Sequence, residues 1–465
     1  DSAAPATATW EDRSAPNAVV SLDPILFTDQ RTGRTQVSQL TGQDSLSAVT
    51  DDDGETWLPS QGGGIPSGVD HQSVGAGPYS QALPVQLYPD AVYYCSQSIA
   101  TAFCARSDDG GLTFGVGVPI YTLTECTGIH GHVKVAPDGT VYVPNRGCGG
   151  QQAVVVSTDN GLTWTVRKVS GSTPSDGDPS VGIGADGTVY FGYQNADGHP
   201  RVAVSHDRGQ TWTNDQDVGT AFGIQNTVFP TVVAGDADRA AFAFLGTPTG
   251  GNYQDTANFT GIWHLYVAHT YDGGRTWVTS DATPNDPVQR GSICTAGTTC
   301  GSDRNLLDFI DITVDAQGRV LVGYADGCIG ACVQSGPNSF SALGTIAREV
   351  SGKRLFAQFD QPDLTDTAVV ASYTRPHSIT LKATVSNIGT ANAGSFVVHF
   401  RDGQTLLGES APLTLAAGQT ATATYNWNTQ GQRGSHTITA IVDPFNRVAE
   451  SNEANNQFTQ TLNVR

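Results

Sequence analysis

Histidine and aspartate recur at matching positions near the start of several short apolar strands. When these strands are aligned by hydrophobic pattern, one position holds His71, His130 and Asp178, and the position two residues later holds His132 and Asp311. Residues two apart in a strand share a face, so these side chains should gather at one end of neighbouring strands. The candidate catalytic residues are His71, His130, His132, Asp178, Asp308, Asp311, Arg304 and Tyr324.

Two interpretations of this set stand side by side. Histidine next to a carboxylate can shuttle a proton near neutral pH or hold a divalent metal. Alternatively, each side chain is a structural hydrogen-bond partner between neighbouring strands. The sequence identifies no cofactor with certainty. A divalent metal ion, calcium or another, is the cofactor that these side chains could bind.

A repeated turn organises the strands that must position these residues. The pattern Ser/Thr-x-Asp-x-Gly-x-Thr-Trp/Phe occurs at Thr50–Trp57, Ser107–Phe114, Ser157–Trp164, Ser205–Trp212 and Thr270–Trp277. In each copy the aspartate can accept backbone N–H groups, the glycine supplies a positive φ, and the aromatic residue anchors the turn. The structural aspartates are Asp52, Asp109, Asp159, Asp207 and Asp272. Copies in frame at roughly 50-residue spacing predict a repeat architecture.

Each turn follows the third of four short strands, as in HVKVAP, TVYVPN, AVVVS, the turn and TWTV. Six such units can be traced, and the last, with a third strand near Ser341–Glu349, lacks the turn. In an antiparallel four-stranded unit, the turn between strands three and four lies at the end opposite the start of strand one. The histidines and the repeated turns should therefore occupy opposite faces.

The turns resemble the Asp-box (BNR) repeat of the sialidase superfamily of β-propellers, over about residues 10–356. The resemblance implies a six-bladed propeller, with a site at the axial mouth opposite the Asp boxes. It also implies a sialidase-like protein that binds or processes extracellular glycan. Authentic sialidase chemistry would need three arginines, a Tyr–Glu pair and an Asp acid. The Phe/Tyr-Arg-Ile-Pro motif is absent and Tyr324 has no evident Glu partner, so a glycoside hydrolase-like enzyme or a His/Tyr polysaccharide lyase are the enzymatic alternatives.

From about residue 361 the pattern changes to alternating strands at Ig-like spacing, which resemble the CARDB module. The predicted fold is therefore all-β, a six-bladed β-propeller followed by an Ig-like β-sandwich. The predicted domains are residues 1–360, with a short N-terminal tail at 1–9, and residues 361–465. Near the end of the module, a cluster predicts either a calcium site or a hydrogen-bonded turn: Asp443, Glu450, Asn452, Glu453 and Asn455.

Eight cysteines stand in close pairs, which predict the disulfides Cys95–Cys104, Cys126–Cys148, Cys294–Cys300 and Cys328–Cys332. Such pairing predicts an oxidising compartment, and hence a secreted or cell-surface protein. Zinc binding is the competing interpretation of the cysteines. All eight are expected in loops on the face away from the repeated turns, where they would brace a binding surface.

Composition narrows the class of partner. The net charge of −20 would repel nucleic acid and anionic membranes, and no apolar run is long enough for a membrane span. The expected partner is an extracellular glycan or surface polymer. The alternative function is a non-catalytic surface, adhesion or assembly protein, with self-assembly through exposed edge strands of the Ig-like module.

Overall fold

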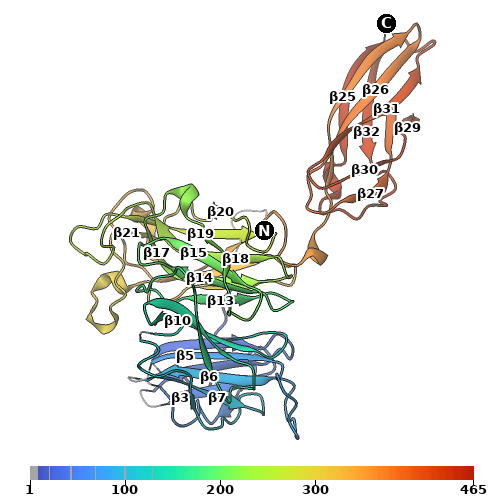
Figure 1. The fold of residues 1–465 in the computed structure, drawn as a ribbon. Coiled ribbons are helices and arrows are strands. Elements are labelled where there is room, and N and C mark those ends of the chain that lie inside the picture. The colour runs from blue at the N-terminus through green and yellow to red at the C-terminus, as the bar shows by residue number, and fades with distance from the viewer. Residues whose placement is uncertain are drawn as a thin grey trace. The chain divides into compact units, whose positions relative to one another are not determined.

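The computed structural model describes residues 9–19, 21–41, 44–68, 70–98, 101–127 and 129–464, and it is all-β (Figure 1). Residues 1–8 of the predicted tail lie outside this described part. The helices within it are short 3-10 turns, η1 to η6, at Thr220–Phe222, Gly297–Thr299, Ser302–Arg304, Gly330–Cys332, Ala357–Phe359 and Glu453–Asn455. In the described ranges no helix has the length and apolar character to span a membrane.

The chain divides into two compact units, Asp1–Glu349 and Val350–Arg465. The first is called the repeat unit here and the second the terminal unit. The predicted domain boundary near residue 360 stays a prediction, which a truncation can test.

Six antiparallel sheets follow one another along the repeat unit, and in each the strands pair in sequence order. Five of them contain four consecutively paired strands, and the sixth, which lacks the repeated turn, contains three among the described residues. The strands are β1 (Leu22–Thr28), β2 (Thr35–Leu40), β3 (Ser45–Thr50), β4 (Leu58–Ser60); β5 (Asp70–Gly77), β6 (Ala91–Gln97), β7 (Ala102–Ser107), β8 (Val118–Pro119); β9 (Lys134–Val135), β10 (Val141–Cys148), β11 (Gln151–Ser157), β12 (Thr165–Lys168); β13 (Ser180–Ile183), β14 (Val189–Gln194), β15 (Pro200–Ser205), β16 (Thr213–Asp217); β17 (Asn226–Ala234), β18 (Ala240–Thr247), β19 (Ile262–Thr270), β20 (Val278–Asp281), with β21 (Gln289–Arg290) on β19; and β22 (Asp311–Val314), β23 (Val320–Asp326), β24 (Leu343–Arg348).

Apolar clusters join consecutive sheets of the repeat unit. Phe27 of the first sheet packs with Val74 and Tyr94 of the second. Corresponding clusters join the second sheet to the third, the third to the fourth and the fourth to the fifth. The second, third and fourth sheets therefore bury both faces against their neighbours, which explains why β14 of the fourth sheet is buried at every position.

The five repeated turns share one hydrogen-bond pattern. In the copy at Ser205–Trp212, Asp207 accepts the backbone N–H of Thr211 at 2.8 Å and its hydroxyl at 2.6 Å. The Ser205 hydroxyl accepts the N–H of Gly209 at 2.7 Å, and Gly209 has φ +84°. The same three bonds recur in the other four copies. The glycine is required because a side chain would be strained at that φ.

All four predicted disulfides are present, namely Cys95–Cys104, Cys126–Cys148, Cys294–Cys300 and Cys328–Cys332. No cysteine of the described residues is free, which leaves none for the competing zinc interpretation. The bridges lie in strand ends and loops at the ends of the sheets opposite the repeated turns. Four disulfides indicate an oxidising environment and therefore an extracellular or surface protein.

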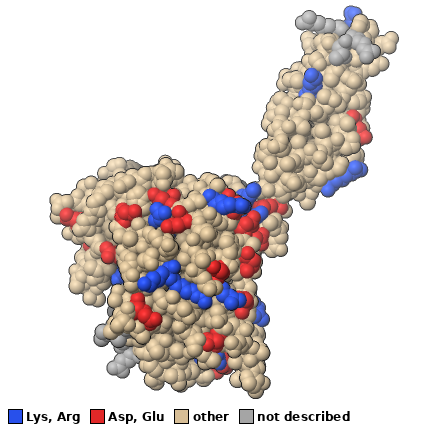
Figure 2. Space-filling model, viewed as in Figure 1, with Lys and Arg blue, Asp and Glu red and all other residues tan. Residues whose placement is uncertain are grey.

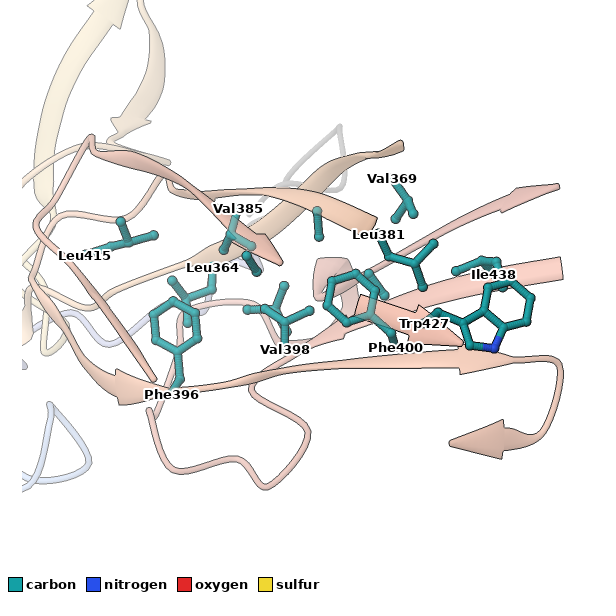
Figure 3. Packing of buried hydrophobic residues seen from close by; sticks show 14 of the residues in the cluster. Leu364, Val369, Leu381, Val385, Phe396, Val398, Phe400, Leu415, Trp427 and Ile438 are labelled. Carbon is teal, nitrogen blue, oxygen red and sulfur yellow. The ribbon is translucent and has the colours of Figure 1, made fainter. Parts of the chain in front are cut away.

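The terminal unit packs its sheets around one apolar core. Its strands are β25 (Leu364–Arg375), β26 (Ser378–Asn387) and β31 (Thr420–Asn428) in one sheet, β27 (Ala393–Phe396) and β30 (Leu413–Leu415) in a second, and β29 (Thr405–Glu409), β28 (Val398–Asp402), β32 (Gly434–Val442) and β33 (Gln457–Val464) in a third. Figure 3 shows Phe396, Val398 and Phe400 lining the interior, opposite Leu381 and Val385. This is an Ig-like arrangement of facing sheets.

Charged side chains of opposite sign are interspersed on the repeat unit, as the face in Figure 2 shows. Several pairs are in contact, such as Arg208 with Asp138 at 2.9 Å and Arg201 with Asp215 at 3.1 Å. Figure 2 also shows a row of Lys and Arg side chains across the middle of that face, with acidic side chains near it.

Candidate functional site

The centre of the candidate site is an ion pair between two sheets of the repeat unit. Nδ1 of His71, in β5, lies 3.1 Å from Oδ2 of Asp178, which precedes β13. The side chains are 13% and 12% exposed. The other carboxylate oxygen, Asp178 Oδ1, is buried without a hydrogen-bond partner among the described residues, and Arg146 lies 3.9 Å from it. Polar atoms in that state are costly, and a bound ligand can satisfy them.

A β-bulge aims His71 into this position. The pairing of β5 with β6 shifts between Asp70 and Ser73, and His71 takes the left-handed φ of +46°. The same device recurs at the equivalent positions Asp23 of β1 and Phe229 of β17, with φ of +49° and +57°. Bulges of this kind re-aim side chains beside functional sites, and a non-glycine residue at positive φ carries strain that the surroundings must offset.

The sixth sheet contributes a clamp and an aromatic ring. Arg304, at the end of η3, donates two hydrogen bonds to Asp308, at 2.9 and 2.6 Å. The next residue, Phe309, is 36% exposed, and its ring centroid lies 5.8 Å from that of His71 and 5.1 Å from that of His132. The ring of Phe309 is therefore close to two imidazoles, one from β5 and one from the segment just before β9.

The two histidines that flank Phe309 have opposite protonation tendencies. Burial alone would lower the pKa of His71, but Asp178, assisted by the charges of Asp70 and Asp23, raises it above its ordinary value. Burial lowers the pKa of His132, and the nearby Asp311 only partly opposes this shift. His71 therefore binds a proton more readily than an ordinary histidine, and His132 binds one less readily.

The other sequence-predicted residues take different places. His130 is buried, its Nδ1 donates to the carbonyl of Gly131 at 2.8 Å, and burial lowers its pKa to about 4, so it lies behind the site. Asp311 is exposed at the start of β22. Tyr324 lies half-buried in β23, where burial and the charges of Asp326 and Asp286 raise its pKa to about 12. Nothing among the described contacts joins Tyr324 to the His71–Asp178 pair.

Two residues of the site were not among the sequence candidates. Arg146 follows the regular part of β10 and lies 3.9 Å from Asp178. Asp23 sits at the bulge of β1, where burial and the charges of Asp308 and Asp70 raise its pKa. Arg146 stands two residues before a disulfide cysteine in a loop on the predicted face, and this position was the available signal. No sequence signal pointed to Asp23, because the bulge shifts this residue out of the aligned strand register.

Metal binding has limited support in this geometry. Among the residues that the structure describes, no three His, Cys, Asp or Glu side chains are grouped to hold a metal ion. In the terminal unit, the cluster predicted as a calcium site or a turn makes many local bonds. Asp443 accepts the N–H of Val448 at 2.8 Å, Asn452 accepts that of Ala454 at 3.0 Å, and the Glu450 carboxylate accepts the Leu364 N–H. These bonds fit the turn interpretation.

Comparisons with known proteins identify the terminal unit. A search of curated proteins gave no match. The CARDB domain of the PF1109 protein from Pyrococcus furiosus, solved in complex with di-metal ions, is 28% identical over 23% of this chain and 94% of that one, with a TM-score of 0.20. A Dyadobacter fermentans protein of unknown function is 15% identical over 70% of this chain and 92% of its own, with a TM-score of 0.40.

A third solved structure similar to this chain is a PL25 ulvan lyase bound to a GlcA(1-4)Rha3S unit. It is 13% identical over 71% of this chain and 79% of its own, with a TM-score of 0.38. The CARDB family model matches residues 361–460, which agrees with the sheets and the apolar core described above. Residues 361–460 of this chain are a CARDB domain.

Proposed function

We propose that this protein is an extracellular, sialidase-like six-bladed β-propeller that binds or processes glycan at the axial end opposite its Asp-box turns. One cavity of about 610 Å³ supports the ring arrangement, because the first strands of all six sheets line it. The contributing residues include Phe27, Ala76, Val135, Val181, Val232 and Ile312. Six first strands around one cavity are what a propeller axis requires.

The observation that carries the functional proposal is the convergence of His71, His132 and Phe309 from the second, third and sixth sheets. A half-exposed aromatic ring with polar groups at its edge suits a sugar, which has apolar C–H faces and hydroxyl edges. Two histidines of opposite protonation tendency beside that ring could protonate a glycosidic oxygen and remove a proton from the sugar. This is acid–base chemistry of the hydrolase or lyase type.

The geometry favours these reactions over authentic sialidase chemistry. Tyr324 would have to be the nucleophile, yet its neighbours are Asp326 and Asp286, and its pKa is raised to about 12. A phenol that resists ionisation is a poor nucleophile without a basic partner. The arginines near the pair, Arg146 and Arg304, contact Asp178 and Asp308. Glycan binding or acid–base cleavage is therefore the proposal.

The test is a panel of soluble polysaccharides. Pectin, alginate, xylan and laminarin are each included in native gels to measure retardation, and digests are followed by absorbance of unsaturated products and by reducing ends. We expect retardation or turnover with at least one polymer, and its loss in His71→Ala. His264→Ala is the matched control, because His264 pairs with Asp281 at 3.4 Å and also has a raised pKa. Addition of EDTA tests the divalent-metal proposal in the same assay.

The absence of retardation and turnover with every polymer would reject the glycan proposal. An equal effect of the His71 and His264 variants would reject the placement of the site at the His71–Asp178 pair, because it would reduce that pair to a structural contact.

A surface or assembly role is the second candidate, and one observation favours it. Strand β25 is an edge strand of twelve residues, and Val370 and Tyr373 on it are 54% and 55% exposed. Long edge strands with exposed apolar side chains can pair with other chains. Sedimentation of the full chain against Val370→Lys would separate the two roles, because a charge on the edge should block assembly and leave glycan retardation unchanged.

A further inference from the structure

A second polar cavity opens at the site end of the fourth and fifth sheets of the repeat unit. Its volume is about 450 Å³, which is in the range of small-ligand sites. Three buried side chains form its floor, Gln194, Asn226 and Tyr253. The rim includes the exposed Asp176, Asp197 and Asn252. We call this cavity the amide cleft, because amide side chains dominate its lining.

Two polar groups are buried at the cleft floor, and the side chains of Gln194 and Tyr253 are only 4% and 6% exposed. Oε1 of Gln194 has no hydrogen-bond partner among the described residues, whereas the Tyr253 hydroxyl lies within hydrogen-bonding reach of Gln194, Gln254 and Thr295. The ring of Tyr253 is held in place by an edge contact with Trp263 at 5.9 Å. An amide oxygen accepts, and a phenol both donates and accepts. A ligand hydroxyl can therefore donate to the Gln194 oxygen and exchange hydrogen bonds with the phenol.

The charge of the residues that line the cleft restricts the class of sugar that can bind there. Asp176 and Asp197 are the charged residues among those that line the cleft, and no lysine or arginine is included. Sugars with carboxylate or sulfate groups would meet like charge there, whereas uncharged hydroxyl-rich sugars would not. The His71–Asp178 site differs, because the cation of Arg146 lies 3.9 Å from Asp178.

One short segment joins the cleft to the His71–Asp178 site. Asp176 lines the cleft, and Asp178, two residues on, contacts His71. Arg146 donates to the Asp176 carbonyl at 2.5 Å and lies 3.9 Å from the Asp178 carboxylate, so it fixes the segment between them. Two residues of extended chain span at most about 7 Å, which is comparable to the length of a sugar unit. A single glycan chain can therefore occupy both places.

We propose that the amide cleft binds an uncharged sugar unit of the same glycan chain whose neighbouring unit lies at the His71–Asp178 pair. This inference rests on the proposed glycan function and makes it more specific. The ligand is a polymer, and its binding uses at least one neutral unit beside the unit acted on. Short fragments that cannot reach the cleft should bind less well than longer ones.

The experiment compares cleft and central variants of the full chain. Tyr253→Phe removes one hydroxyl and keeps the ring, and Gln194→Leu removes the amide. Each is titrated calorimetrically with pectin, alginate, xylan and laminarin fragments, both disaccharides and longer oligosaccharides. For any polymer that the wild type retards, we expect each variant to weaken binding of the longer fragments by about tenfold. Disaccharides that fill only the central site should bind unchanged, and His71→Ala should weaken both.

The outcomes separate the two proposals. If no polymer binds the wild type, the glycan function itself is rejected. If His71→Ala weakens binding while the cleft variants bind long fragments like the wild type, the cleft inference alone fails. If the cleft variants weaken binding and His71→Ala does not, the cleft is the primary site and the central proposal is overturned. Melting temperature is measured for every variant, and Asn252→Ala on the rim serves as a second, fold-neutral probe should Gln194→Leu unfold.

Discussion

The repeat unit and the terminal unit bury their polar side chains in different ways. In the terminal unit the sheets enclose an apolar core that includes Leu381, Phe400 and Ile438, and the acidic cluster at its end is largely engaged with backbone N–H groups. In the repeat unit the apolar contacts lie between consecutive sheets, and Asp178, just before β13, keeps one buried carboxylate oxygen without a hydrogen-bond partner among the described residues.

Both units contain buried polar atoms without hydrogen-bond partners among the described residues, such as Asp178 Oδ1 in the repeat unit and Asp366 Oδ2 in the terminal unit. In the repeat unit the Asp178 carboxylate pairs with His71, and the rings of His71 and His132 both lie against the ring of Phe309. That convergence of titratable and aromatic side chains is why we propose ligand chemistry for the repeat unit.

The largest expected effect is that of His71→Ala on glycan turnover. Loss of a general acid should reduce the rate by about 10²–10⁴-fold, because proton transfer to the leaving oxygen would then depend on water. The measurement is the initial rate of product release at fixed folded concentration. A rate within twofold of the wild type, at equal folded concentration, would show that the His71–Asp178 pair does not catalyse the reaction.

The next effect separates the scaffold face from the site face. Trp212→Ala removes a half-buried ring that packs edge-on against Phe191 at 5.6 Å beneath a repeated turn. The free energy of unfolding of the repeat unit should fall by about 3 kcal/mol, with glycan retardation unchanged at equal folded concentration. Calorimetric melting measures the loss. Unchanged melting together with lost retardation would reverse the assignment of the two faces.

A smaller effect concerns pH. The folded pKa of His71 is raised above 6.5, so its ion pair with Asp178 stabilises the repeat unit fully below pH 6.5, and this stabilisation is lost as the pH rises through the folded pKa. Asp178→Asn removes the main cause of the raised pKa and leaves burial, which lowers it. The decline in melting temperature with rising pH should therefore disappear in the variant. NMR titration of the imidazole should show a lower pKa, and an unshifted titration would contradict the pairing.

Much of the fold followed from local sequence patterns. The cysteine pairs and the repeated turns depend on residues a few positions apart, and the pairs Cys95–Cys104 and Cys328–Cys332 were predicted for that reason. Strand β24, Leu343–Arg348, also lies where the hydrophobic pattern placed a third strand. Closure of six sheets into a propeller remains a proposal, supported by the cavity that the first strands share.

The candidate site was only partly predictable, because strand alignment assumes regular strands. The residues before β9, Lys134–Val135, are irregular, and His130 makes only an isolated bridge with Asn145. His130 is buried, whereas the ring of His132 contacts Phe309. The floor of the amide cleft combines Gln194 and Tyr253 from different sheets, a proximity that no local pattern encodes.

The smallest expected effect is that of removing the CARDB domain. A chain that ends at Asp360 should keep the melting temperature and glycan retardation of the repeat unit, because the core of the terminal unit is made of its own strands. A second chain that ends at Glu349 tests the segment between the two boundaries, which contains the fully buried Leu355. Equal stability of the two truncated chains would place this segment with the terminal unit. Lower stability of the shorter chain would place Leu355 in the core of the repeat unit and support the boundary predicted from sequence. Aggregation of both chains would show that the two units share a core. The assignment of separate roles to the repeat unit and the terminal unit would then be wrong.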